Sequence, residues 1–539
     1  MGKYIDVIIV STFFLIMISV SVFYAIKYKK DKAEEFITGG KHLNWFQTGM
    51  ALIGTMFDPG IMGNTALAFV WGFYLVQWNA VHIWFTATFS AMFFIAVYWR
   101  SKITTTTEYL EKRFSYASRA VFSVIMSLMM ISWLAYGVYM GGVLLHNFLG
   151  WDLFWSSALM IGICAFIVTM GGVRTMLSMS VFQSALLIAA ILGVGIAGFI
   201  LVGGFPGIRE MTELGKAGTP MKSLIPPMHF SIFNQDLYPF PAVITFCVIA
   251  GLSWIVCNFS MAQRFLAAKD ESHAQKGLIM AGAANAFIYI LAYAVGVAMH
   301  KVYPNLNPDD AFMQLLLKFP AGLKGLLMVG LIAALFSSKS GLLSATGTLL
   351  IQDIYARMIK KNAAASHYKN ATQVLQIVIA ASVLLCLPIF INASKQRIPA
   401  YELIQVFMGD VLGVIIAIFI LGIFFTKTAP KSSFYGVVIA VAVGTILHYA
   451  PKGTLYELNF SVIGTLEFII AMLVGIIGSR FERPKTPEQL TNLTIWTLED
   501  VKGPWVGLKS WKGLIIWIFA LPVAWFLVTL IWELYMNNA

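Results

Sequence analysis

A series of long apolar runs separated by short polar segments is the feature that most constrains this chain. A helix needs roughly 20 predominantly apolar residues to cross the hydrocarbon core of a bilayer, and fourteen runs meet that need. They cover residues 4–26, 44–71, 73–98, 120–145, 153–171, 175–203, 237–263, 277–299, 325–352, 373–392, 402–426, 433–450, 459–479 and 513–532. The sequence therefore predicts an all-α polytopic membrane protein with about fourteen transmembrane helices.

The composition excludes a soluble multidomain enzyme. Of the 539 residues, 59% are hydrophobic and only 12% are charged, whereas a soluble domain has about 25% charged residues. So few charges cannot cover a water-exposed surface. The four cysteines lie inside apolar runs without the spacing of metal ligands, and we interpret them as small buried hydrophobes.

The net charge of +12 does not indicate a nucleic-acid partner, because the basic residues form short clusters between apolar runs. Such clusters are typical of cytoplasmic loops that face anionic lipid. With the N-terminus placed outside, the cytoplasmic segments hold 26 Lys and Arg and the outer segments hold 10. This asymmetry predicts that both termini lie outside a plasma (inner) membrane.

Two runs carry polar interruptions at membrane depth. The second contains Asp58-Pro59-Gly60, and proline frees the carbonyls near residues 54–57. Two interpretations are open: a simple proline kink, or free carbonyls that line a cavity and bind a cation. The seventh run has Gly251-Leu252-Ser253-Trp254 and then Asn258-Phe259-Ser260.

Interruptions at matching places five helices apart predict a 5+5 inverted-repeat core. The expected divisions are an extra helix and loop at 1–43, a first repeat at 44–203, an outer loop at 204–236, a second repeat at 237–426, and additional helices at 427–539.

The ninth run carries a stripe of small and hydroxyl-bearing residues at helical spacing, formed by Ala334, Ser337, Gly341, Ser344 and Thr348. Such a stripe permits close helix packing. The adjacent hydroxyls of Ser337 and Ser338 also suit a small hard cation, and both interpretations are open.

Several segments resemble the sodium:solute symporter family. They are F-I-T-G-G-K-H-L-N-W-F at 36–46, T-E-Y-L-E-K-R-F at 107–114, G-G-V-R-T-M-L-S-M-S-V-F-Q at 171–183, Q-R-F-L-A-A-K at 263–269 with A-Q-K-G at 274–277, and A-L-F-S-S at 334–338 with D-I-Y at 353–355. The resemblance covers roughly residues 1–480. It implies fourteen helices, an inverted-repeat core of the LeuT type and alternating-access transport.

The resemblance also implies a sodium site. By matching position, its ligands are the carbonyls of Gly54, Phe57 and Ala334 and the hydroxyls of Ser337 and Ser338. The aromatic inner gate of the family falls on Trp254, with Asn258 nearby.

The chain departs from the family pattern at four positions. Ser180 stands where an aspartate commonly supports the sodium site, and Ile61 stands where sugar transporters have a glutamine. Asp58 replaces a small or hydroxyl residue, and Lys339 directly follows the serine pair. A typical sugar site is therefore not expected.

Charges inside the membrane are costly and need partners or water. Asp58 is a candidate sixth cation ligand or a partner for a substrate ammonium, and Asp410 lies either near another helix break or at a loop edge. Lys339 lies about 200° from Ser337 on an ideal helix. Three roles are open for Lys339: an ion pair with an acid such as Asp58, a built-in cation that replaces sodium, or a snorkelling side chain.

The sequence predicts a secondary active transporter that couples sodium to uptake of a small organic solute. Candidate solute-binding residues are Asp58, Ile61, Gln77, Asn79, Trp254 and Asn258, and Asp58, Lys339 and Asp410 are candidate coupling charges. One alternative keeps the fold with proton-coupled or ion-independent transport. Another is a transport-inactive sensor or a subunit of a membrane complex. An enzyme is not expected, because no nucleophile–base pair or metal cluster can be assembled.

Overall fold

The computed structural model describes residues 2–27, 40–57, 60–216, 218–225, 242–450, 457–499 and 511–537. Throughout these ranges the secondary structure is helical, without a β-strand. Within them, nine helices are long and apolar enough to cross a membrane, or up to eleven if two bent pairs each count as one span. A multi-pass membrane architecture follows. The number of fourteen spans and the outward position of both termini stay predictions.

The helices follow the predicted apolar runs. They are α1 (Gly2–Lys27), α3 (Trp45–Met56), α4 (Gly60–Trp71), α5 (Val76–Arg100), α6 (Thr106–Arg113), α7 (Tyr116–Leu149), α8 (Leu153–Leu201), α9 (Gly204–Arg209), α10 (Ala242–Leu252), α11 (Phe259–Leu266), α12 (Glu271–Val302), α13 (Ala311–Leu316), α14 (Leu323–Leu349), α15 (Ala365–Leu384), α16 (Leu387–Lys395), α17 (Ala400–Phe424), α18 (Pro430–Tyr449), α19 (Phe460–Gly478) and α20 (Trp511–Asn537). Short helical segments are η1 (Phe73–Leu75), η2 (Ser253–Cys257), η3 (Pro308–Asp310), η4 (Leu350–Ile359), η5 (Ser479–Phe481) and η6 (Glu488–Leu490).

Both predicted interruptions are confirmed. The second span divides into α3, which ends at Met56, and α4, which begins at Gly60. The seventh passes from α10 through the π-helical η2 into α11, with a bend of 55°. Asn258 begins α11, because its side chain accepts the backbone N–H of Ser260 at 2.9 Å, a typical N-cap. The 5+5 repeat division stays a prediction.

Helix α8 differs from the prediction. The sequence predicts a loop between the spans at 153–171 and 175–203, and this is wrong: the helix runs unbroken from Leu153 to Leu201. Glycine costs only about 1 kcal/mol in a helix interior, so the Gly171-Gly172 pair weakens the helix without ending it.

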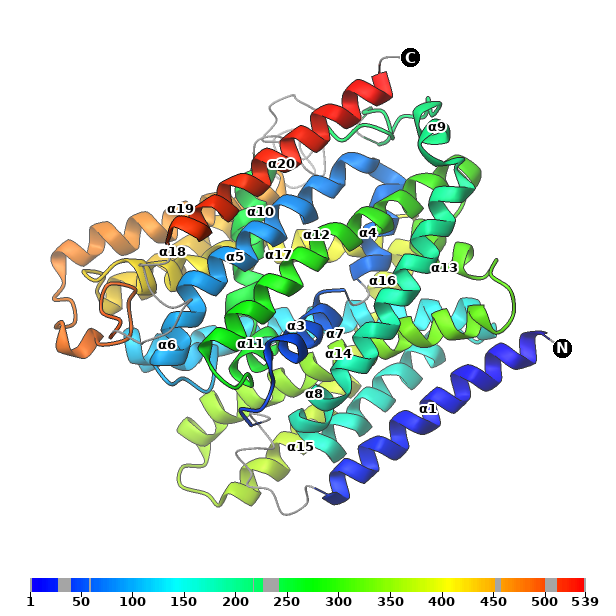
Figure 1. Ribbon diagram of the computed structural model, residues 1–539. Coiled ribbons are helices and arrows are strands. Elements are labelled where there is room, and N and C mark those ends of the chain that lie inside the picture. The colour runs from blue at the N-terminus through cyan, green and yellow to red at the C-terminus, as the bar shows by residue number, and fades with distance from the viewer. Residues whose placement is uncertain are drawn as a thin grey trace.

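Helix α14 forms the middle of the bundle. It packs against α8, α7, α3, α1 and α15, and 94% of its apolar window is buried. In Figure 1, α1 and α20 lie on opposite sides of the bundle, and α18 and α19 lie together at one edge. A helix that is buried on all sides faces other helices rather than solvent or lipid. Helix α14 can therefore contribute residues to sites inside the bundle.

A buried ionic network joins two of the segments that carry the family resemblance. The Asp353 carboxylate accepts from Arg119 Nη2 at 2.6 Å and from the hydroxyls of Thr107 and Ser123. These residues come from η4, α6 and α7. Because the carboxylate is fully buried, its partners are what make it tolerable there, and they fix α6 and α7 to the end of α14.

Candidate functional site

A cavity lies between the two broken helices and α5, α7, α12 and α17. Its volume is about 80 Å³, room for several waters where one needs roughly 10–15 Å³. The lining residues are Met56, Gly60, Ile83, Trp133, Ala250, Gly251, Trp254, Ile255, Asn285, Tyr289, Tyr401, Gln405, Met408 and Leu412.

Aromatic side chains form one wall of the cavity. Trp254 of η2 lies against Trp133 of α7, with ring centroids 4.8 Å apart. Tyr401 of α17 packs edge-on against Trp133 at 5.7 Å. The π-helical turn places Trp254 in this wall, so the candidate gate residue of the sequence lines the cavity.

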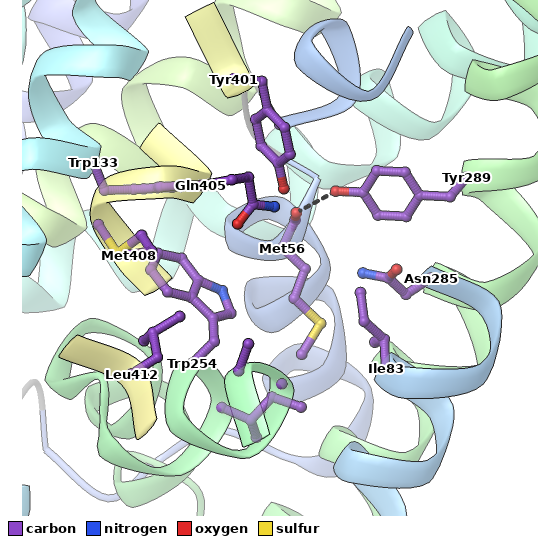
Figure 2. A pocket seen from close by; sticks show the side chains of 14 residues that line it. Met56, Ile83, Trp133, Trp254, Asn285, Tyr289, Tyr401, Gln405, Met408 and Leu412 are labelled. Carbon is purple, nitrogen blue, oxygen red and sulfur yellow. Dashed lines mark hydrogen bonds between the residues drawn. The ribbon is translucent and has the colours of Figure 1, made fainter. Parts of the chain in front are cut away.

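Two amides and a tyrosine supply polarity. In Figure 2, Asn285 and Gln405 point toward Met56 from opposite sides, and the Tyr289 hydroxyl donates to the Met56 carbonyl at 2.9 Å. Asn285 is fully buried, and neither of its amide atoms has a hydrogen-bond partner among the residues that the structure describes. Buried polar groups are normally paired, so this amide is suited to a bound molecule.

The sequence analysis missed Asn285 and Gln405. Each is a single amide within an apolar run, at 277–299 and 402–426, and that isolation is the signal which marks them. A lone buried amide is costly without a partner, but the sequence does not show which way it points.

Some of the predicted solute-binding residues lie at the cavity or are buried near the helix breaks, and others do not. Trp254 lines the cavity, and Ile61 is buried directly after the lining residue Gly60. Asn258 is fully buried, and its Nδ2 has no hydrogen-bond partner in the described ranges.

Gln77 lies apart from the cavity. Its amide donates to the Leu224 carbonyl at 3.0 Å and to Thr529 at 3.2 Å, and it accepts from Trp525 at 2.5 Å. These contacts tie α5 to α20. Asp58 lies outside the described residues, and so do the side chains of Asn79 on α5 and Asp410 on α17. Helix α17 bends by 45° between Gly409 and Val411.

Two of the predicted sodium ligands, Gly54 of α3 and Ser337 of α14, lie next to each other. A Cβ atom placed on Gly54 would lie 3.8 Å from Ser337 Oγ. Ser337 is 2% exposed, and within the described part of the chain its hydroxyl has no hydrogen-bond partner. Ala334 lies one turn away on the same buried helix, and Phe57 is the residue that ends α3. The Ser337 oxygen is therefore buried beside the broken helix α3.

Helix α8 adds a hydroxyl that the sequence analysis did not single out. Ser184 Oγ donates to the Met50 carbonyl at 2.6 Å and lies directly against Gly54, where any Cβ would overlap it. Glycine at position 54 therefore allows α3 to approach α8 this closely. Ser180, at the position of the family aspartate, is fully buried one turn earlier.

Lys339 faces a different neighbour from Ser337, as its helical spacing predicts. Its side chain runs against Gly137 of α7, and Nζ lies 3.5 Å from the Trp133 carbonyl oxygen. Nζ is also 5.8 Å from the centroid of the Trp133 ring. The ammonium is thus held behind the aromatic wall of the cavity, on the α7 side of α14.

A buried cavity between two helices that break at membrane depth is the architecture of secondary transporters. The model of the sodium:solute symporter family matches residues 36–440. This match covers most of the chain, and the protein belongs to the sodium:solute symporter family. It is a transporter rather than an enzyme.

Individual relatives are distant in sequence, but the similarity extends over most of both chains. The chain is 23% identical to a human sodium/myo-inositol cotransporter, over 92% of this chain and 76% of the relative. It is 22% identical to a Danio rerio sodium/glucose cotransporter 4, over 93% and 83%.

Solved structures share the fold. A Na⁺-coupled sialic acid symporter in a substrate-bound outward-open state matches with a TM-score of 0.74 and 22% identity, over 89% of this chain and 99% of that one. Mhp1, a nucleobase-cation-symport transporter in a closed conformation, matches with a TM-score of 0.55 and 14% identity, over 82% and 93%.

Proposed function

We propose that this protein is a sodium-coupled symporter that carries a small organic solute across the plasma membrane by alternating access. Family membership and the names of the sodium cotransporter relatives support sodium as the coupled ion. Sodium is then a transported substrate rather than a resident cofactor.

The observation that carries the proposal is the buried, unpartnered hydroxyl of Ser337 beside the broken helix α3. In this proposal the carbonyls of Gly54, Phe57 and Ala334 and the hydroxyls of Ser337 and Ser338 hold the ion. Oxygen ligands of this kind suit a hard cation. A bound ion would satisfy the Ser337 hydroxyl, whose burial without a partner costs about 1–3 kcal/mol.

The solute would occupy the cavity between Trp254 and Asn285. The aromatic wall offers apolar contact, and the amides of Asn285 and Gln405 offer donors and acceptors. Pockets of this composition bind small molecules with an apolar body and a few polar groups. Asp58, which lies in the sequence between the lining residues Met56 and Gly60, would add a negative charge for a solute ammonium or for the ion itself.

Coupling between ion and solute would follow from the two helices that the ion connects. Sodium would bridge the half-helix α3 to the long helix α14, so its binding favours the conformation in which these helices are together. The membrane potential contributes about 2.3 kcal/mol per 100 mV for each charge moved inward.

Serine-to-alanine variants test the sodium site. We expect Ser337→Ala and Ser338→Ala each to weaken sodium binding roughly ten- to hundredfold, because each removes one ligand worth about 1–3 kcal/mol. Sodium titration of purified protein measures the affinity, and the melting temperature shows that folding is intact. Wild-type sodium affinity in both variants would contradict the site.

A further inference from the structure

Arg264 of α11 is a buried cation at one end of the proposed sodium site. The sequence analysis placed it in a cytoplasmic segment after a span ending at residue 263, but α11 continues to Leu266 and Arg264 is fully buried. Its guanidinium donates to the carbonyls of Ser260 at 2.5 Å, Ala51 at 3.1 Å and Ser337 at 3.2 Å. One side chain therefore joins α11, α3 and α14.

The two helices that carry the proposed sodium ligands each supply an acceptor, and Ser337 accepts through its backbone carbonyl while its hydroxyl is one of those ligands. Ala51 precedes Gly54 by three residues, and Ser337 follows Ala334 by three. Three residues rise about 4.5 Å along a helix. The predicted cytoplasmic segment at 27–43 precedes α3. Arg264 thus stands at the cytoplasmic end of the site, between the ion and the inside.

We propose that Arg264 is a latch for the sodium site: a positioning residue that closes its cytoplasmic end and holds sodium affinity down. This inference rests on the proposed sodium site. The half-helices α3 and α11 each lie on the cytoplasmic side of a break, and inward release requires them to separate from α14. That separation breaks the bonds to Ala51 and Ser337 together, so the exit opens in a single step.

The charge acts on the ion as well. A guanidinium close to a bound sodium ion repels it, because like charges interact more strongly inside a protein than in water. The ion is consequently held less tightly than its oxygen ligands alone would hold it, which favours its release once the latch opens.

Gly341 makes room for the latch. A Cβ atom at this position would lie 2.7 Å from Arg264 Nη2 and 3.0 Å from Ser260 Oγ. The small-residue stripe of α14 therefore has a specific purpose at this point, because any side chain here would displace the guanidinium.

Arg113 provides a matched control. It is also fully buried, and its guanidinium donates to the backbone carbonyls of Gly422, Phe425 and Thr428 at 3.0, 2.7 and 3.2 Å. These bonds join α6 to the end of α17 rather than to α3 or α14. Removing Arg113 tests the general cost of losing a buried arginine.

The test uses sodium alone, so it needs no knowledge of the solute. Sodium-22 binding is measured on purified protein, and solute-free sodium-22 flux is measured in proteoliposomes. We expect Arg264→Gln to bind sodium about tenfold more tightly and to leak sodium at several times the wild-type rate. Arg113→Gln is expected to match the wild type in both measurements.

Two further variants separate geometry from charge. Arg264→Lys keeps the charge but cannot reach all the carbonyls, so sodium affinity stays within about threefold of wild type while the leak rises. Gly341→Ala keeps the arginine but displaces it, and its leak also rises. If Arg264→Gln does not fold, these two variants decide, and wild-type leak in both overturns the latch.

The outcome also distinguishes the latch from the sodium site itself. A leak of Arg264→Gln no greater than that of Arg113→Gln overturns the latch whatever the affinity. If Ser337→Ala still loses sodium binding in that case, the proposed function stands and only the latch is wrong. Unchanged sodium binding in Ser337→Ala would instead overturn the site on which the latch rests.

Discussion

The Asn285 amide shows how a single residue can favour function over stability. Both of its polar atoms are buried without partners among the described residues, at a cost of about 1–3 kcal/mol. Asn64 of α4 is equally buried, but it donates to the Gly60 carbonyl and accepts from the Tyr293 hydroxyl, both at 2.6 Å. Two buried asparagines therefore have opposite relations to stability.

We predict that Asn285→Leu raises the melting temperature of the solute-free protein, whereas Asn64→Leu lowers it. The first change removes unpaired polar atoms beside a cavity, and the second breaks formed hydrogen bonds. Thermal unfolding of both variants in detergent measures the difference. Asn285→Leu is also expected to lose solute affinity by ten- to hundredfold. A drop in melting temperature equal to that of Asn64→Leu would show that Asn285 is a structural residue.

The contact between Lys339 and Gly137 leads to a second prediction about single residues. A Cβ at Gly137 would overlap the end of the lysine chain, and overpacking of this kind costs about 1–3 kcal/mol. We predict that Gly137→Ala is destabilising and that Lys339→Ala partly restores stability in the double variant. Melting temperatures of the single and double variants give the coupling.

Gly141 is the control for this contact, since it lies one turn further along α7. A Cβ there would lie 3.0 Å from Met160 Cε, whereas a Cβ at Gly137 would lie 1.8 Å from Lys339 Cε. Gly141→Ala should cost less than Gly137→Ala, and Lys339→Ala should not rescue it. Additive effects of Gly137→Ala and Lys339→Ala would place the lysine elsewhere.

At the scale of elements, η3 holds the start of α17 through one buried acid. Asp309 accepts from the Ala400 N–H at 3.2 Å and from the Tyr139 hydroxyl at 3.1 Å. It lies in the segment between α12 and α13. Burial raises the pKa of Asp309 to about 7, against the opposing effect of these two hydrogen bonds. The folded protein therefore holds a proton that the unfolded chain releases near pH 4.

The raised pKa of Asp309 sets the direction in which stability changes with pH. The folded state binds more protons than the unfolded state between about pH 4 and pH 7, so this group lowers stability as the pH rises through that window. We predict that Asp309→Asn flattens the fall in melting temperature between pH 5 and pH 8. Melting curves of both proteins across this range measure the slope. An unchanged slope in the variant would show that Asp309 is not the titrating group.

What the sequence could predict differs by element in physical terms. The breaks at Asp58-Pro59-Gly60 and at Asn258 depend on local chemistry, a missing backbone donor and a capping side chain, so the sequence identified both. The continuous α8 was missed because the apolar run is interrupted between residues 171 and 175, although the helix continues through this interruption. Gln77 was assigned toward the solute, but its partners on α20 lie about 450 residues away in the chain. No local pattern reveals such a contact.

Arg264 illustrates the same limit of local pattern at the site. A basic residue after an apolar run indicates a cytoplasmic loop. Here, however, carbonyls from three helices accept hydrogen bonds from the Arg264 guanidinium inside the bundle. The direction of a side chain on a helix follows from its spacing, which is why Ser337 and Lys339 were correctly separated. The partners that it meets depend on how whole helices pack.

At the scale of the whole molecule, sodium and solute should stabilise the fold together. Ligands that bind only the folded state add RT ln(1 + [L]/Kd), about 2.7 kcal/mol at a hundredfold excess over Kd. We predict that sodium raises the melting temperature by a few degrees relative to choline, because it joins α3 to α14. The shift should disappear in the Ser337→Ala, Ser338→Ala double variant.

A library of small organic solutes, screened by thermal shift in sodium and in choline, then tests the coupling. We expect the transported solute to raise the melting temperature further in sodium and only weakly in choline, since each ligand favours the conformation that the other binds. An equal solute shift in both salts, with no effect of sodium alone, would contradict sodium coupling and favour the proton-coupled or ion-independent alternative. Repeating that screen at two pH values separates these two. No shift with any solute or with sodium, from protein that co-purifies with a stoichiometric partner, would favour the complex subunit, because that role requires neither the cavity nor the proposed sodium site between α3 and α14 to bind a ligand.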